Sequence, residues 1–161
     1  MKHSQSSFDL LEQSLWRRGV TRPLNNISPL YIEMIASTIQ TGVEKVWATL
    51  GSGHSEIIYQ NALRIELSKS KEIHHLSSGR VVPITYEGIS VGSCVLDLDF
   101  VTNFDQMVIL ELKSIRALRS DDHMQILRYT RLFGNVIGFL INFPTGDAKP
   151  EIHEFVGEEG R

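Results

Sequence analysis

The sequence of 161 residues carries a formal net charge of −3, with 42% hydrophobic and 22% charged residues. These values are typical of a globular domain rather than of a disordered or membrane protein. The longest nearly unbroken apolar run, residues 136–143, is too short to span a bilayer, and residues 1–7 are too polar for a secretory signal. Cys94 is the single cysteine, which excludes an internal disulfide and a cysteine zinc cluster. We expect an intracellular protein, cytoplasmic or nuclear, that does not enter a membrane.

The chain is predicted to form one domain over residues 28–157, with an N-terminal appendage at 1–27 and a short tail at 158–161. The appendage contains one candidate helix, over residues 8–17. Ser28 and Pro29 make a favourable helix start, and apolar residues then recur every three or four positions up to Leu50. This spacing predicts a long amphipathic helix, and a second helix is predicted over residues 55–68.

After residue 80 the apolar residues change from helical spacing to alternation. Three strands, over residues 81–86, 90–102 and 107–114, are predicted to form a meander. A helix is predicted next, over residues 120–133, and two more strands follow, over residues 135–142 and 152–156. The last of these strands is only a candidate. This order of elements predicts an α/β or α+β fold.

Two neighbouring strands of the meander carry charged residues at alternating positions. Asp97 and Asp99 share one face of the second strand, and Glu111 and Lys113 share one face of the third. If the two faces coincide, the acids converge beside a lysine and require a cation such as Mg²⁺ or Mn²⁺. Such an ion activates a bound water and offsets charge on a phosphate under attack. The same alternation also describes a two-stranded ribbon with one face in water.

Five short motifs occur in order between residues 28 and 143. They are Gly53-x-x-Glu56-x-x-Tyr59, residues 83–92 followed by Asp97-Leu98, Glu111-x-Lys113 within residues 108–113, Gln125-x-x-x-Tyr129, and residues 138–143. Together they resemble the GxxExxY family of the PD-(D/E)XK nuclease superfamily, a RecB-like and restriction-endonuclease-like group. The resemblance implies a restriction-endonuclease-like core, in which helices pack on a small mixed central sheet in the order α-β-β-β-α-β.

The resemblance also assigns roles to single residues. Asp97 and Glu111 would be the principal metal ligands, for Mg²⁺ or Mn²⁺, and Lys113 would be the catalytic lysine. Glu56 would serve as an additional ligand or as a water-positioning acid. The pair at i and i+4 on the next helix would orient the substrate or the site's own side chains, and consists of Gln125 and Tyr129.

The choice between the two aspartates stays open at the level of sequence. Counting forward from residues 91–92 favours Asp97, whereas counting back from Glu111 favours Asp99, because the connecting loop is longer here than in the family. Both would border the metal, and Asp97 is preferred. Simpler roles stay open for other positions: Glu56 as an acid at a helix start, Gln125 as an exposed residue, and Tyr59 and Tyr129 as core residues.

The implied function is a divalent-metal-dependent nuclease that hydrolyses phosphodiesters with metal-activated water, acting on DNA rather than RNA. Four basic side chains are candidate contacts for backbone phosphates: Arg116, Arg119, Arg128 and Arg131. Two alternatives are a catalytically silent nuclease-fold module for nucleic-acid binding or assembly, and a metal-dependent phosphoesterase for a small substrate. Because so small a domain has little surface for recognition, a homodimer or a partner protein is a further expectation.

Overall fold

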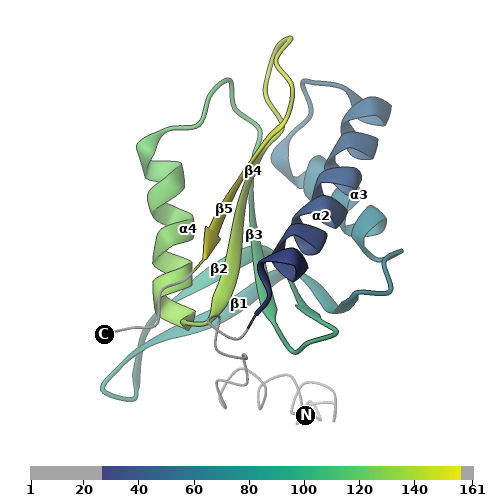
Figure 1. Ribbon diagram of the computed structural model, residues 1–161. Helices are drawn as coiled ribbons and strands as arrows, with labels where there is room; N and C mark the ends of the chain where they lie inside the picture. The colour runs from purple at the N-terminus through teal and green to yellow at the C-terminus, as the bar shows by residue number, and fades with distance from the viewer. Residues whose placement is uncertain (1–26, 157–161) are drawn as a thin grey trace, which may run out of the picture.

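The computed structural model describes residues 27–156, so the predicted helix at 8–17 and the tail at 158–161 lie outside the described residues. Within this range, a five-stranded sheet in the order β1-β2-β3-β4-β5 lies between α2 and α3 on one face and α4 on the other (Figure 1). The elements are α2 (Pro29–Leu50), α3 (Glu56–Leu67), β1 (Ile73–Tyr86), β2 (Ile89–Thr102), β3 (Met107–Lys113), α4 (Ser120–Phe133), β4 (Val136–Asn142) and β5 (Glu151–Val156). The predicted α+β architecture is confirmed.

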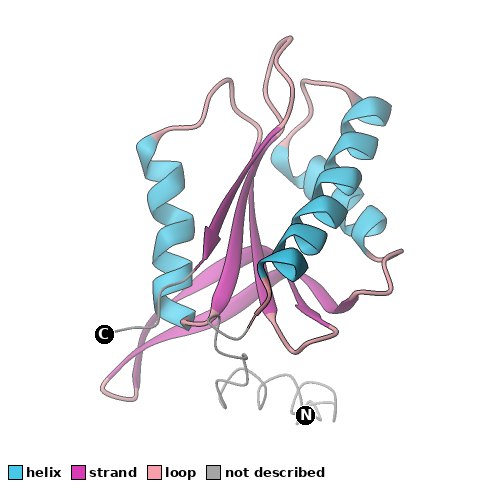
Figure 2. Cartoon of the chain, viewed as in Figure 1, coloured by secondary structure: helices cyan, strands magenta, loops and turns pink. Residues whose placement is uncertain are grey.

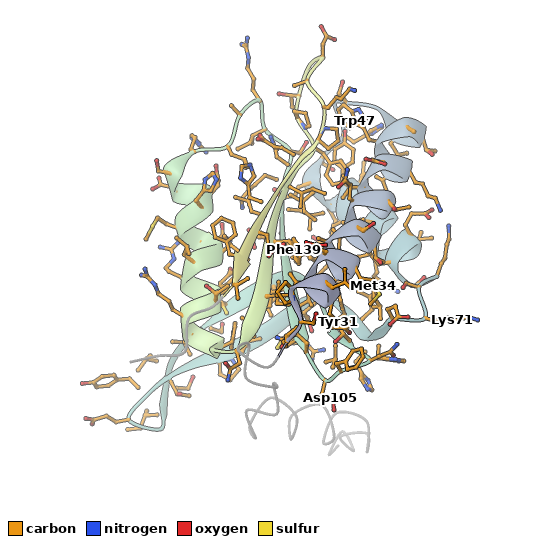
Figure 3. All side chains as sticks on the ribbon, viewed as in Figure 1. Tyr31, Met34, Trp47, Lys71, Asp105 and Phe139 are labelled. Carbon is orange, nitrogen blue, oxygen red and sulfur yellow. The ribbon has the colours of Figure 1, made fainter. Side chains whose placement is uncertain are left out.

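The first helical layer forms because two amphipathic helices bury one stripe each. In α2 the stripe includes Ile35, Ile39 and Val43, and in α3 it includes Tyr59 and Leu63. These side chains meet the apolar residues of one sheet face in a single buried cluster. Figure 3 shows Phe139 of β4 in this layer, between the sheet and α2.

The other face of the sheet is covered by α4, which connects the parallel strands β3 and β4. A parallel pair needs such a crossover, because its two strands run in the same direction. Ile126 of α4 packs with Ile109 and Leu140 in a second buried cluster. A Cβ at Gly138 of β4 would lie 2.9 Å from side-chain atoms of Ile126 and Thr130, so glycine permits this close approach of helix to sheet.

The strands β2 and β3 pair over only part of their lengths. Their antiparallel ladder joins residues 98–101 to residues 107–110, and before Leu98 the long strand β2 pairs with β1 alone. The sheet therefore forks at Asp97, and the β1–β2 arm extends past α4 (Figure 1). At the fork Gly79 of β1, opposite Asp97, has a φ of +65°, in the left-handed region that favours glycine.

The fork also interrupts the alternation of side chains along β2. Leu98 belongs to the cluster beneath α2 and α3, whereas Leu96 belongs to the cluster beneath α4. Regular alternation would place both leucines on one face of β2, so the alternation predicted for this strand does not continue through Asp97. The first strand is also longer than predicted, since it begins at Ile73 and not at residue 81.

Three connecting segments gather at one end of the molecule: residues 51–55 before α3, residues 114–119 before α4, and residues 143–150 between β4 and β5 (Figure 2). Hydrogen bonds join them, from Ser114 Oγ to His54 O at 2.8 Å and from Phe143 N to Lys113 O at 2.8 Å. The carboxyl end of β3 lies among these segments. No helix of residues 27–156 is both long and apolar enough to cross a membrane.

Candidate active site

A chain of hydrogen bonds joins β3 to α4 at the fork. Lys113 Nζ donates to Glu111 Oε1 at 2.7 Å and to Gln125 Oε1 at 3.0 Å. Gln125 Nε2 in turn donates to the hydroxyl of Tyr129 at 3.2 Å, and that hydroxyl donates to Val95 O at 3.3 Å. Glu111 and Lys113 come together because they are two residues apart on one face of β3, and Gln125 and Tyr129 because they are one helical turn apart.

Asp97 reaches the same site from β2. Its Oδ2 accepts a hydrogen bond from Leu112 N at 2.8 Å, in the position where the β2–β3 ladder has already ended. Gln60 of α3 donates from Nε2 to Asp97 O at 2.9 Å, which holds this residue from the other side. The Asp97 side chain thus bonds to β3 where backbone pairing between β2 and β3 has ended. Its carboxylate lies beside the backbone that joins Glu111 to Lys113.

Glu56 is the first residue of α3 and is half-buried. Burial raises the pKa of its carboxyl group, the charge of Asp97 raises it further, and Lys113 opposes them. The charge of Asp122, near the start of α4, adds to the same rise. Glu56 therefore lies within electrostatic range of the β2 and β3 groups.

Partial removal from water raises the pKa of the acidic groups at this site. Burial raises the pKa of Glu111 to about 7, and the charges of Asp97 and Glu56 act in the same direction. The pKa of Asp97 is also raised, first by burial. For Lys113 burial favours the neutral form, but the hydrogen bond and charge of Glu111 outweigh it and raise the pKa.

Asp99, the other candidate ligand, is engaged elsewhere. Arg80 Nε lies 3.1 Å from its Oδ1 and 3.0 Å from its Oδ2, and Arg80 Nη2 donates to Ser77 Oγ at 2.7 Å. Asp99 is only 2% exposed, so this pair is largely removed from water. These contacts favour Asp97 over Asp99 as the acid that is available to a cation.

The four candidate phosphate contacts all lie on the surface of residues 113–131. They belong to the segment before α4 and to α4 itself, and they are exposed: Arg116, Arg119, Arg128 and Arg131. Arg119 also borders Asp122 at 3.9 Å, and its backbone N–H donates to the Asp122 carboxylate at 2.8 Å. The helix begins at Ser120 and is capped by this acid.

One observation favours a divalent cation at this site, and a second one argues against a site made of protein ligands alone. Glu111 Oε2 is buried without a hydrogen-bond partner, which leaves a carboxylate oxygen free for a ligand. Yet across residues 27–156 no three His, Cys, Asp or Glu side chains are grouped closely enough to hold an ion. Mg²⁺ commonly takes only one or two carboxylates together with waters and substrate phosphates, so Asp97 and Glu111 fit such an ion.

Three contributors to the site were not found from the sequence. Gln60 and the Leu112 amide fix Asp97, and Asp122 adds to the negative field at Glu56. A signal existed only for Gln60, a polar residue that interrupts an otherwise apolar stripe in the second helix. The amide could not be foreseen, because a regular ladder would have used it in pairing with β2.

Comparisons with known proteins bear on the family. The search of curated proteins found no relative that matches this sequence. A solved structure described as "Crystal structure of SSO0001" is similar to 94% of this chain and 80% of its own, at 14% identity and a TM-score of 0.43. The family model described as "PD-(D/E)XK nuclease superfamily" matches residues 33–155, which run from the first turns of α2 into β5. The chain therefore belongs to the PD-(D/E)XK nuclease superfamily.

Proposed function

We propose that this protein is a divalent-metal-dependent nuclease of the GxxExxY type, which hydrolyses phosphodiester bonds of DNA rather than RNA. The observation that supports the proposal is that Asp97, Glu111 and Lys113 lie together at the end of β3, with Glu56 within electrostatic range. Burial raises the pKa of all three carboxyl groups, and a set of partly desolvated acids is a costly arrangement for structure alone. Family membership makes a hydrolytic role the natural reading of this arrangement.

Asp97 and Glu111 are the residues that would hold Mg²⁺ or Mn²⁺. Glu56 would serve as an additional ligand or would position the attacking water. A divalent ion bound there supplies Lewis-acid stabilisation of phosphate charge and a water of lowered pKa. Lys113, held by Glu111 and Gln125, orients its ammonium group toward the same space. Gln125 and Tyr129 fix that lysine, so their role is to position it.

The experiment is a cleavage assay on end-labelled single- and double-stranded DNA and RNA with Mg²⁺ or Mn²⁺. Glu111→Ala and Lys113→Ala are expected to lower the rate by about 100-fold or more, which is the usual loss when a residue acting in the chemical step is removed. Glu154→Ala and Lys45→Ala change exposed residues of the same types on β5 and α2 and serve as matched controls. Full cutting by both site variants would falsify the assignment.

A catalytically silent binding module is the second candidate. It is favoured by one observation, that Lys113 neutralises Glu111 in a region where no three-acid cluster forms within residues 27–156. Salt-sensitive DNA binding without cleavage under any divalent cation would select this alternative. Cleavage of a small phosphodiester but of no polynucleotide would select a small-substrate phosphoesterase.

A further inference from the structure

The segment 51–55, which connects α2 to α3, determines where Glu56 lies. Gly51 and Gly53 have φ values of +67° and +95°, so the backbone turns through conformations that other residues rarely adopt. Glu56 follows directly as the first residue of α3. A shift of this segment would move the Glu56 carboxylate relative to the acids on the strands.

The hydroxyl of Tyr59 holds this segment from within α3. It donates to Gly51 O at 2.7 Å and accepts from His54 N at 3.3 Å, and so connects the two ends of the turn. The Tyr59 ring is fully buried and stacks on Phe143, with centroids 4.4 Å apart and planes 2° apart. The ring therefore has a fixed place from which its hydroxyl can act.

The hydroxyl of Ser114 holds the same segment from the sheet. Ser114 follows Lys113, and its Oγ donates to His54 O at 2.8 Å. The backbone on either side is anchored to β4: Phe143 N donates to Lys113 O at 2.8 Å, and the Asn142 side chain makes hydrogen bonds of 3.1 and 3.0 Å with the Ile115 N–H and C=O groups.

We propose that Tyr59 and Ser114 are positioning residues, which form a two-hydroxyl clamp on residues 51–55 and fix the start of α3, and with it Glu56, relative to Glu111 and Lys113. The inference rests on the proposed function. Both hydroxyls act on His54, one at its N–H and the other at its C=O, so this peptide segment is fixed on both sides. The clamp connects α3 to the end of β3 through the segment 51–55.

The test uses the full chain and single-atom changes. Tyr59→Phe keeps the stacked ring and removes the hydroxyl, whereas Ser114→Ala removes the second hydroxyl and Ser114→Thr retains it. Ser68→Ala is the matched control, since its hydroxyl donates to Ile65 O at the far end of α3. The measurements are Mn²⁺ affinity by calorimetry, kcat and KM on DNA at saturating Mn²⁺, and hydrogen exchange of the His54 amide.

Tyr59→Phe and Ser114→Ala are each expected to weaken Mn²⁺ binding by about 10-fold, as loss of a supporting hydrogen bond commonly does, and to lower kcat more than they change KM. In Tyr59→Phe the His54 amide should exchange faster. Ser114→Thr and Ser68→Ala should behave as wild type. If the wild-type protein is active, two results overturn the clamp alone. In the first, Ser114→Ala and Tyr59→Phe keep full Mn²⁺ affinity and kcat. In the second, Ser68→Ala loses as much Mn²⁺ affinity and kcat as they do. A wild-type protein that neither binds Mn²⁺ nor cuts overturns the proposed function as well.

Discussion

At Glu111 the burial of a carboxylate has a measurable thermodynamic consequence. Its pKa is about 7 in the folded protein against 4.5 for an unperturbed glutamate, so the folded state binds this proton more tightly than the unfolded chain. The stabilisation is fully present below about pH 4.5 and is lost as the pH rises through 7. A shift of this size corresponds to a loss of about 3 kcal/mol, as an order of magnitude.

We therefore predict that the free energy of unfolding of the metal-free protein falls between pH 4.5 and 7.5, and that Glu111→Gln removes most of this fall. Urea unfolding in the presence of a chelator measures both. Glu154→Gln, an exposed substitution of the same kind, should keep the wild-type slope. An unchanged slope in Glu111→Gln would show that other groups carry the pH dependence.

Tyr129 offers a second prediction at this scale. Tyr129→Phe removes the acceptor of Gln125 and the donor to Val95 O, which frees the amide that holds Lys113. We expect a several-fold lower kcat with a stability loss of about 1 kcal/mol, the net value of a typical hydrogen bond. Steady-state cleavage and thermal unfolding of the same preparation separate the two effects, and an unaltered kcat would contradict a positioning role.

Regular spacing along one element predicted which side chains lie in contact. Glu111 and Lys113 were placed together by strand alternation, and Gln125 and Tyr129 by helical spacing. The sequence preferred Asp97 but left Asp99 open, because the ion pair of Asp99 with Arg80 depends on the register of β1, which no local pattern encodes.

At the scale of elements, the contact of α4 with β4 depends on a missing side chain. A Cβ at Gly138 would lie 2.9 Å from Ile126 Cγ1 and Thr130 Cγ2, which is closer than such atoms approach. We predict that Gly138→Ala lowers the free energy of unfolding by about 1–3 kcal/mol, the usual cost of overpacking. Chemical denaturation provides the measurement.

A compensating change tests the stated cause of that loss. Thr130→Ser removes Cγ2 and retains the hydroxyl that donates to Leu127 O. If overpacking is the reason, the double variant Gly138→Ala/Thr130→Ser should recover part of the stability that Gly138→Ala loses. Strictly additive losses would indicate another cause.

Element boundaries were predicted to within a residue or two for α2, α3, α4 and β4, where caps or buried stripes mark the ends. The first half of β1 was missed. Residues 73–80 are mostly polar and lie at the edge of the sheet, where they pair through their backbone with β2. Backbone pairing of this kind leaves little hydrophobic pattern to read.

For the whole molecule, a net charge of −3 implies that nucleic-acid binding depends on local charge. Exposed arginines on and before α4 are the proposed phosphate contacts, so log K should fall linearly with log salt. We predict that the double variant Arg128→Gln/Arg131→Gln reduces this slope by about 2, close to one per lost contact. Fluorescence anisotropy with labelled DNA in a chelator and over a series of salt concentrations measures the slope. Arg64→Gln, on the exposed surface of α3, should leave it unchanged, and an equal effect at Arg64 would mean that binding is not localised to α4.

The fork in the sheet has a dynamic consequence. Only residues 98–101 of β2 are laddered to β3, so the β1–β2 arm is a candidate for a separate cooperative unit that opens before the central strands do. Such an excursion would carry Asp97 away from Glu111, since each lies on a different side of the opening. An ion that binds both acids would then slow amide hydrogen exchange throughout the β1–β2 arm, including at its tip, which the ion does not contact. Exchange rates of amides far from the site would therefore report whether the ion is bound.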